Sequence, residues 1–533
     1  MILAPDYLSR ERLRLQEQTR LDAGKRPGER NRLGQFATPG ALAREIAEYA
    51  RRLWGSRREG IRFLDPAVGT GAFYSALLTA FPSPAVEAAT GVEIDRELAA
   101  AARALWGDVG LNVVDADFTR LDPPPERFNL VLTNPPYVRH HHLDAVYKLR
   151  LRGLVRNVLG RDISGLAGFY CYFMILAHRW MAQDGIGVWL VPSEFMDVSY
   201  GSALKHYLTE KVALLRVHRF DPEETQFDDA LVSSAVVVFQ NTLPDPSHET
   251  VFSYGGGLLR PREETSVSLV AARGKRKWSS LAAFSGGVTS DSGPTLDSFF
   301  AVRRGIATGS NRFFVLGRDE AEGIGIDEGF LKPILPGPRH LRECLIQANP
   351  DGYPRIAKQL VVIDSDMPLE HISRACPGLS MYLAAGMEKG VHRGYLATRR
   401  VPWYRQEQRP PAPFLCTYMG RRGATKEPFR FIRNLSQATA ANVYLLLYPV
   451  GALKAALVAD PSMAEAVFKF LQCIDTRQLI DEGRVYGGGL YKIEPAELGR
   501  VSAAGLADAL HLRVPQRPIQ PALPGTDALR VLA

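Results

Sequence analysis

Cysteine is scarce in this sequence of 533 residues, and none of its five cysteines belongs to a CxxC pair. They lie far apart along the chain, at Cys171, Cys344, Cys376, Cys416 and Cys473. This spacing argues against a disulfide framework and against a zinc site built from cysteine. We therefore expect no bound metal.

Long apolar runs are also absent. No stretch approaches the roughly 18 apolar residues that a membrane-spanning helix requires. The N-terminus is charged from Asp6 onward, which is unlike a signal peptide. These absences predict a cytoplasmic protein without a membrane partner.

Basic residues are in excess and give a net charge of +8 at pH 7. A basic surface favours an anionic partner such as nucleic acid, although a soluble basic enzyme would show the same balance. The chain is longer than one typical hydrophobic core accommodates, so two or three domains are expected.

Composition divides the chain into five segments. The first is polar and arginine-rich, the second alternates regularly, the third is rich in proline, serine and glycine, and the fourth mixes short strands with aromatics. The predicted segments are an N-terminal basic extension at 1–34 with a short helix at 6–21, a catalytic domain at 35–245, a linker at 246–300, an α+β domain at 301–515 with one clear helix at 460–473, and a proline-rich tail at 516–533.

Apolar runs and helical runs alternate between residues 61 and 240. Strands that are buried on both faces and joined by helices predict a doubly wound α/β sheet, here of seven strands. The expected strands are 61–65, 89–94, 111–116, 128–133, 185–191, 214–220 and 233–239, and the expected helices are 72–81, 95–106, 166–182 and 200–210.

The stretch FLDPAVGTGAF, residues 63–73, follows the first predicted strand. Gly69 and Gly71 leave the backbone bare, so it can turn sharply and a ligand can lie against it. The carboxyl end of a strand is where open α/β sheets bind ligands. Tyr74 stands where a dinucleotide fingerprint has its third glycine, so the loop alone is a weak signal.

Two further strand ends carry groups suited to a nucleoside. Glu93 ends the second strand, about 20 residues beyond the loop, where a carboxylate accepts hydrogen bonds from ribose hydroxyls. At the third strand end, Asp117 can accept a hydrogen bond from an adenine amino group and Phe118 can pack on its ring. Together they predict an adenosine-containing cofactor, and they fit NAD and S-adenosylmethionine equally.

The stretch TNPPYV, residues 133–138, ends the fourth predicted strand beside the first. The lone pair of adenine's amino group is delocalised into the ring. The amide oxygen of Asn134 and the carbonyl of Pro135 can each accept one hydrogen of that group, while Tyr137 stacks on the ring. The two prolines, Pro135 and Pro136, fix these acceptors before the reaction. This chemistry selects S-adenosylmethionine over NAD; the alternative is a purely structural cis-proline turn.

These motifs resemble the DNA adenine methyltransferases of the amino-group class, in the TaqI-like and Eco57I-like (gamma) order. FLDPAVGTGAF, GVEID, DADF and TNPPYV follow the order of that family, and GQFATPGALAREIA at 34–47 is similar to its N-terminal cofactor motif. The resemblance implies a Rossmann-like methyltransferase sheet and S-adenosylmethionine as cofactor. It also implies methyl transfer to N6 of an adenine flipped out of double-stranded DNA.

The resemblance also implies roles for individual residues. Thr38 and Pro39 lie near the methionine end of the cofactor, and QFDDALVSSAVVVF at 226–239 resembles the motif whose aromatic, here Phe227, packs on the flipped base opposite Tyr137. The implied catalytic residues are Asn134, Pro135, Pro136, Tyr137 and Phe227, and the implied cofactor-binding residues are Thr38, Pro39, Asp65, Pro66, Ala67, Gly69, Gly71, Glu93, Ile94, Asp117 and Phe118.

Segments of the fourth region resemble the target-recognition region of the same family. They are 302–314, 330–341, 401–418 and 486–498, a looser match than the catalytic motifs. Arginines there are candidates for phosphate contacts, and some for reading guanine edges. The candidate DNA contacts are Arg139, His140, Arg303, Arg304, Arg312, Arg339, Arg421 and Arg422, together with Arg399 and Arg400. Three consecutive histidines, 140–142, cannot all face one metal, so we expect a loop near the substrate there.

Other functions remain open from the sequence. A methyltransferase of ribosomal RNA or of a protein glutamine also uses an NPPY-type loop, but lacks the GQFATP segment and a large C-terminal domain. A DNA-recognition subunit without catalysis is the alternative of another class. A fused nuclease is not expected, because the residues before GQFATP are too few. The expected partner is therefore a separate restriction endonuclease or another defence protein.

Overall fold

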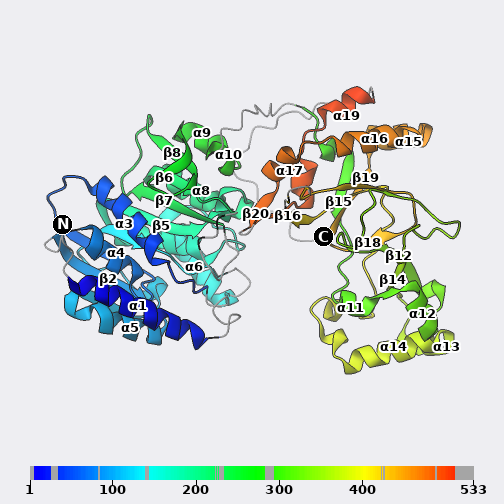
Figure 1. The fold of residues 1–533 in the computed structure, drawn as a ribbon, viewed down its shortest axis with the longest axis horizontal. Helices are drawn as coiled ribbons and strands as arrows, with labels where there is room; N and C mark the ends of the chain where they lie inside the picture. Colours follow the sequence, from blue (N-terminus) through cyan, green and yellow to red (C-terminus); the bar gives the residue numbers. More distant parts are fainter. Residues whose placement is uncertain are drawn as a thin grey trace. The chain divides into compact units, whose positions relative to one another are not determined.

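The computed structural model describes most of the chain. The described residues are 5–25, 34–81, 85–138, 143–222, 224, 226, 233–282, 293–421, 423, 427–486 and 489–510. They form two compact units, which Figure 1 labels by element. Unit 1 comprises Met1–Gly287 with Tyr486–Gly489, and unit 2 comprises Val288–Val485 with Leu490–Ala533.

Unit 1 is built on a nine-stranded sheet with the order β3-β2-β1-β4-β5-β7-β6-β8-β9. The strands are β1 (Ile61–Asp65), β2 (Val86–Glu93), β3 (Leu111–Asp115), β4 (Phe128–Thr133), β5 (Met181–Pro192), β6 (Ala213–Arg219), β7 (Ser234–Gln240), β8 (Glu249–Gly256) and β9 (Pro261–Ser268).

The doubly wound arrangement predicted from the sequence is confirmed. The pairs β1–β2, β1–β4, β2–β3 and β4–β5 are parallel, whereas β7 is antiparallel to both β5 and β6. All six residues of β4 are buried, since this strand lies between β1 and β5. The chain order reverses between β1 and β4, which brings the loops after these two strands to the same crevice.

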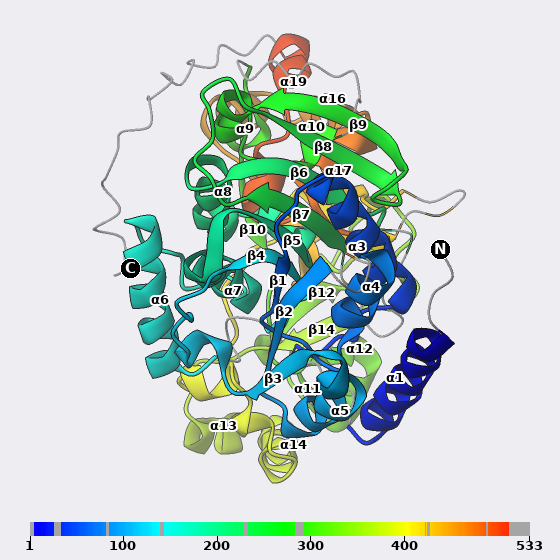
Figure 2. The same cartoon turned by 90° about the vertical axis from the view of Figure 1, so that its left-hand side faces the viewer.

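Helices cover both faces of this sheet (Figure 2). Alternate residues of one strand enter different cores: Phe63 packs with α3 and α4, whereas Leu64 packs with α7 and α8. The helices of unit 1 are α1 (Pro5–Ala23), α3 (Gly40–Trp54), α4 (Ala72–Ala80), α5 (Arg96–Trp106), α6 (Ala145–Leu159), α7 (Phe169–Ala177), α8 (Ser202–Glu210), α9 (Leu269–Gly274) and α10 (Ser279–Ala282).

Two predictions about these elements need correction. The helix expected at 166–182 ends at Ala177, and a short 3₁₀ turn leads directly into β5 at Met181. The run is apolar except for His178 and Arg179, so its hydrophobicity gave no sign of the change from helix to strand.

The linker expected at 246–300 is the larger error. Its first part forms β8 and β9, which add two strands to the seven expected: β8 pairs parallel with β6, and β9 pairs antiparallel with β8. Proline and serine in this stretch suggested loop, but β9 is an edge strand with five exposed positions, where polar residues are tolerated.

Unit 2 is an α+β unit, as expected. A five-stranded sheet has the order β10-β19-β15-β17-β13, and a four-stranded sheet has the order β11-β14-β12-β18. The strands are β10 (Phe300–Arg304), β11 (Val315–Gly317), β12 (Leu331–Leu335), β13 (Leu345–Ile346), β14 (Leu360–Ile363), β15 (Phe414–Thr417), β16 (Met419–Arg421), β17 (Phe431–Asn434), β18 (Thr439–Ala440), β19 (Tyr444–Pro449), β20 (Arg484–Tyr486) and β21 (Leu490–Lys492).

Unit 2 has three separate hydrophobic clusters, and its helices contribute to two of them. The helix expected at 460–473 is α16. The helices are α11 (Asn311–Phe314), α12 (Arg318–Ile324), α13 (Leu369–Ala375), α14 (Pro377–Glu388), α15 (Gly451–Ala459), α16 (Met463–Gln472), α17 (Thr476–Glu482), α18 (Pro495–Gly499) and α19 (Ala504–Ala509). Among the helices of the described chain, none has the length and apolar character needed to cross a bilayer.

Candidate active site

The glycine loop between β1 and α4 is shaped by its two glycines. Gly71 has φ 90°, and a Cβ there would lie 2.5 Å from Nε1 of Trp106, so no other residue fits. Gly69 has φ 54°, yet a Cβ there would meet nothing within 4 Å. One side of the loop is therefore packed against protein, while the Gly69 side is open to a ligand.

Two buried carboxylates stand beside this loop. Glu93 accepts the backbone N–H of Gly69 at 2.9 Å with Oε2 and that of Asp95 at 2.9 Å with Oε1. Each oxygen keeps a lone pair for a further donor. Asp65 accepts the N–H of Ala67 at 3.1 Å. Burial raises the pKa of Glu93, and burial together with the nearby charge of Glu93 raises the pKa of Asp65 to about 7.

At the third strand end, the predicted acceptor Asp117 already has hydrogen-bond partners. Asp117 accepts four hydrogen bonds, from the N–H and hydroxyl of Thr119, from the hydroxyl of Tyr147 at 2.9 Å and from Nε of Arg120 at 3.2 Å. These donors fill the four acceptor positions of a carboxylate. Arg120 is 66% exposed, so it is the most accessible of these partners.

Phe118 and Ile94 have opposite environments. Phe118 is only 2% exposed and packs on Phe173 and Trp180, with ring centroids 5.4 and 4.9 Å away. It therefore forms the floor of this region rather than an open face. Ile94, directly after Glu93, is 66% exposed and leaves an apolar side chain beside the carboxylate.

Asn134 is held by the segment that precedes α3. Its side-chain N–H₂ donates to the carbonyl of Phe36 at 3.0 Å and to the hydroxyl of Thr38 at 3.1 Å. Both hydrogens are thus engaged, and the orientation of the amide is fixed. Oδ1 is buried and has no hydrogen-bond partner among the described residues. An unpaired buried acceptor is costly, so it marks a position that another donor completes.

The rest of the TNPPYV corner is held by the same segment. The N–H of Tyr137 donates to the carbonyl of Gly34 at 3.1 Å, and a Cβ at Gly34 would lie 2.5 Å from that nitrogen. The ring of Phe36 lies 5.6 Å from that of Tyr137. Tyr137 also donates its hydroxyl to the carbonyl of Leu190 at 3.2 Å, and burial raises its pKa well above the usual value.

The prolines of this corner leave an acceptor open. Pro135 is buried, and Pro136 is partly exposed. Among the described residues, no hydrogen bond is formed to the Pro135 carbonyl. The cis peptide bond recorded in the described chain is Val401–Pro402, so the cis-proline turn considered from the sequence is not present at residues 134–136.

Two family models match this sequence. Residues 110–227 match the Eco57I restriction-modification methylase, and residues 280–514 match the C-terminal domain of the type II methyltransferase M.Eco57I. The type II methyltransferase M.XamI of Xanthomonas campestris pv. amaranthicola is 28% identical over 490 residues, 89% of this chain and 86% of that protein. The type II methyltransferase M.AccI of Acinetobacter calcoaceticus is 25% identical over 500 residues, which cover 90% of this chain and 87% of that protein.

The chain belongs to the Eco57I-like restriction-modification methyltransferases. S-adenosylmethionine is accordingly its cofactor, and its activity is methylation of DNA.

Solved structures support the fold of this methyltransferase. The type IIL restriction-modification enzyme MmeI in complex with DNA has a TM-score of 0.53 at 13% identity, over 86% of this chain and 64% of that one. The DrdV–DNA complex has a TM-score of 0.51 at 14% identity, over 89% of this chain and 56% of that one. The methyltransferase thus spans less than two thirds of either chain, and the likeness is one of fold.

The residues of unit 1 fit S-adenosylmethionine. The open side of Gly69, the buried carboxylate of Glu93 and the exposed side chain of Ile94 lie in sequence order at neighbouring strand ends, as ribose and adenine binding requires. Thr38 is buried and already contacts Asn134, so the predicted N-terminal motif and the predicted catalytic corner meet. Pro39 is the N-cap of α3, directly after Thr38.

The sequence did not identify how the N-terminal helix of the methyltransferase contributes. Arg14 is only 1% exposed and donates to the Thr70 hydroxyl of the glycine loop at 3.2 Å. That hydroxyl donates to Gln18 at 2.8 Å. Glu11 pairs with Arg14. Polar residues at these positions resemble any solvated helix, so the sequence held no sign of this role.

A second contact ties the N-terminal region to the cofactor side. Lys25 forms an ion pair with Asp95, and Gln35 donates to the same Oδ2 of Asp95 at 3.0 Å. Burial alone would raise the pKa of Asp95, but the hydrogen bonds and charge of its partners hold it below the usual value. The segment predicted as a basic extension is therefore attached next to Glu93 and Ile94.

Several predicted residues lie outside the described part of the chain. They are Phe227, Arg139, His140 with the two following histidines, and Arg422. Their predicted roles stay predictions.

The candidate arginines of unit 2 differ in their exposure and in their contacts. Arg303, Arg312, Arg339 and Arg421 are exposed. Arg304 is exposed, but its guanidinium lies 4.1 Å from the ring centroid of Tyr418 and its Nε donates to the carbonyl of Asn442. Arg399 stacks on Tyr395 at 3.7 Å.

Arg400 differs from all of these. Its guanidinium donates to the carbonyls of Ala307 and Thr308 and to Oε1 of Gln406. It therefore holds a loop in place and is not a free cation for DNA.

Proposed function

We propose that this methyltransferase transfers a methyl group to the exocyclic N6 of adenine, flipped out of duplex DNA. The observation that carries the proposal is the buried, unpartnered Oδ1 of Asn134, with the amide nitrogen committed to Phe36 and Thr38. An acceptor oriented in this way is complementary to an N–H donor, and an exocyclic amino group offers two of them.

The second hydrogen of the amino group is assigned to the Pro135 carbonyl. Accepting both hydrogens draws the nitrogen toward tetrahedral geometry and makes its lone pair available. Bound S-adenosylmethionine supplies the electrophilic methyl group. Asn134 and Pro135 need no reorientation during the reaction, because the peptide corner and the contacts to Phe36 and Thr38 fix them beforehand.

Cofactor binding is assigned to the residues around the glycine loop. Glu93 would accept from the ribose hydroxyls, Ile94 would cover the adenine of the cofactor, and the main chain of Pro66, Ala67 and Gly69 would line its methionine side. Asp117 would bind the cofactor's adenine amino group in exchange for Arg120.

A base within a duplex cannot reach this corner, so extrusion of the base is part of the proposal. Tyr137 would form one side of the base pocket and Phe227 the other. Unit 2 would bind the surrounding duplex, which fits the excess of basic residues in the chain. A separate restriction endonuclease is the proposed functional partner.

Single-molecule methylome sequencing tests this proposal. The full chain would be expressed in a methylation-deficient bacterial host, with Asn134→Ala as the matched inactive variant. We expect N6-methyladenine in one short sequence motif with the wild-type chain and none with the variant. N4-methylcytosine instead would keep the amino-group chemistry but overturn the choice of adenine. Unmodified DNA from cells with folded, cofactor-binding protein would favour RNA or protein as the substrate.

A further inference from the structure

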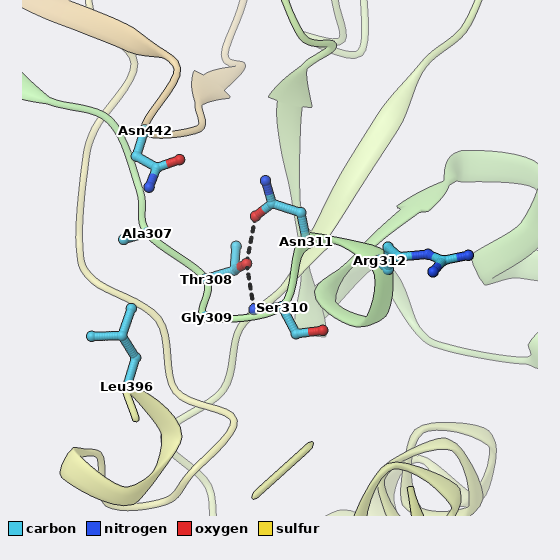
Figure 3. Close-up of a pocket in the computed structure, with 8 residues that line it drawn as sticks. All are labelled: Ala307, Thr308, Gly309, Ser310, Asn311, Arg312, Leu396 and Asn442. Carbon is cyan, nitrogen blue, oxygen red and sulfur yellow. Dashed lines mark hydrogen bonds between the residues drawn. The ribbon is translucent and has the colours of Figure 1, made fainter. Parts of the chain in front are cut away.

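A hollow of about 440 Å³ lies in unit 2, beside the segment that follows β10 (Figure 3). We call it the Thr308 hollow. Its lining contains one arginine and no acidic residue, so its charge favours an anion. The lining residues are Ala307, Thr308, Gly309, Ser310, Asn311, Arg312, Leu396 and Asn442.

The wall of the hollow is fixed from behind. The N–H of Ile306 donates to the carbonyl of Ala440 at 2.9 Å, and the N–H of Asn442 donates to the carbonyl of Ile306 at 2.9 Å. Arg400 donates to the carbonyl of Ala307 at 2.5 Å and to that of Thr308 at 3.0 Å. Burial lowers the pKa of Arg400. The loop is thus held by main-chain pairing on one side and by a guanidinium on the other.

Thr308 determines how Asn311 faces the hollow. Its side chain is 1% exposed, its hydroxyl donates to Oδ1 of Asn311 at 2.5 Å, and it accepts the N–H of Ser310 at 3.2 Å (Figure 3). Oδ1 of Asn311 therefore already accepts one hydrogen bond and keeps one lone pair. Its N–H₂ forms no hydrogen bond with the described residues, so this side chain offers two donors and one remaining acceptor position.

The remaining polar groups agree with an acceptor-rich ligand. Arg312 is exposed and forms no ion pair within the described ranges. The side-chain amide of Asn442 likewise has no hydrogen-bond partner in the part of the chain that the structure describes, and Ser310 adds a hydroxyl. A guanidinium, amide donors and a hydroxyl are the groups that bind DNA phosphates.

The hydrogen-bonding groups of Asn311 favour a phosphate. Asparagine reads adenine through two bonds, accepting from N6 with its carbonyl and donating to N7 with its amide. The bond from Thr308 already engages Oδ1 of Asn311, whereas both hydrogens of its amide have no partner among the described residues. A phosphodiester needs donors alone, and this amide supplies two.

We propose that the Thr308 hollow binds one backbone phosphate of the DNA substrate. The inference rests on the proposed function, since it assumes that unit 2 binds the methylated duplex. It assigns the hollow to positioning of the duplex, with Asn311 and Arg312 as the contacting residues and Thr308 and Arg400 as positioning residues. The contact adds affinity without reading sequence.

Fluorescence anisotropy on the full chain tests this assignment. Two duplexes serve as probes, one containing the motif found by methylome sequencing and one lacking it. We expect Asn311→Ala and Arg312→Ala each to weaken binding of both duplexes by the same factor, about tenfold. For Arg312→Ala, the slope of log K against log salt should also fall in magnitude by about 0.9. Arg477→Ala, at another exposed arginine of unit 2, is the charge-matched control.

Methylphosphonate duplexes locate the contact. Replacing phosphates one at a time by the neutral methylphosphonate should reveal one position that weakens the wild type but not Arg312→Ala. If the variants lose affinity only for the motif duplex, the hollow reads a base. If they bind both duplexes as tightly as the wild type does, the hollow binds no DNA. Either result overturns the proposal.

The two proposals can fail separately. If the wild-type chain neither binds nor methylates DNA, the proposed function itself is wrong. If the wild type methylates DNA and the variants bind and methylate it equally well, only the role of the hollow is wrong.

Discussion

At the scale of single residues, the orientation of the Asn134 amide follows from contacts made by its nitrogen. Phe36 and Thr38 engage both amide hydrogens, so the oxygen is presented without a competing donor. We expect Asn134→Ala to lower kcat by about 10²–10³-fold, as loss of one oriented transition-state partner does elsewhere. Cofactor affinity, measured by calorimetry, should stay within twofold of wild type, about 0.4 kcal/mol. Near-normal turnover would remove Asn134 from the mechanism.

The shifted carboxyl of Asp65 gives a second residue-scale prediction. Its usual pKa is 3.8, and burial raises the pKa of the folded-state group to about 7. A carboxyl that binds its proton more tightly when folded stabilises the fold fully below pH ~4 and loses that contribution as pH rises to ~7. Asp65→Asn keeps the acceptor for Ala67 but removes this titration.

We therefore expect Asp65→Asn to gain stability relative to wild type between pH 5 and pH 8. The comparison is of unfolding free energies from urea titrations at the two values. An equal difference at both pH values would show that Asp65 titrates normally in the folded chain.

The sequence predicted where residues lie when local order along the chain sets their place. Asn134 directly follows β4, Glu93 ends β2, and Gly69 and Gly71 lie in the loop between β1 and α4, and strand ends define the crevice. It failed where the partner is remote. Nothing near Thr119 indicated that Tyr147 would contact Asp117, and the burial of Phe118 among other aromatics depends on α7. Arg14 was indistinguishable from its exposed neighbours for the same reason.

At the scale of elements, α1 is the part whose effect is least expected. It places Arg14 on Thr70, while Trp106 donates to the Thr70 carbonyl at 2.9 Å from the other side. Burial alone would raise the pKa of Glu11, but the hydrogen bonds and charge of Arg14 hold it below the usual value. The glycine loop is thus fixed before any cofactor arrives.

We expect Arg14→Met to lower the unfolding free energy by roughly 3 kcal/mol, because it leaves the partly buried carboxylate of Glu11 without its ion-pair partner. It should also weaken S-adenosylmethionine binding several-fold, since Thr70 is no longer held. Arg20→Met is the matched control: Arg20 lies on the same helix, is 67% exposed and pairs only with Glu17 among the described residues. Surface pairs of this kind contribute little. Equal effects of the two variants would reduce the role of Arg14 to that of any helix residue.

At the scale of the whole molecule, two units with separate cores carry separate tasks in the proposal. Unit 1 contains the cofactor and amide sites, and unit 2 contains the Thr308 hollow and the exposed arginines. The sequence indicated this division through the loss of alternation after residue 240. It misplaced the boundary, because β8 and β9 join the sheet after the regular alternation of strands and helices has ended. β8 pairs with β6, and β9 pairs with β8.

A fragment of residues 1–282 should therefore fold cooperatively and bind S-adenosylmethionine, while its affinity for duplex DNA should fall at least tenfold. A fragment of residues 1–245 follows the boundary expected from the sequence and should aggregate, since it exposes the edge of β6. Thermal unfolding and calorimetry on both fragments make the comparison. Equal folding of the two would show that β8 and β9 are dispensable, and undiminished DNA affinity of 1–282 would move DNA binding to unit 1.

The last strand of the sheet also limits how copies of this protein can pair with one another. β9 begins with Pro261, which has no N–H to offer, and continues with the charged side chains of Arg262, Glu263 and Glu264. Such an edge has no donor at Pro261 and presents an unfavourable charge pattern to a neighbouring chain. A DNA modification enzyme must not aggregate while it methylates the genome. In this chain, the two strands that were expected to be a linker therefore end the sheet, at the β9 side, in an edge that disfavours pairing with a second copy.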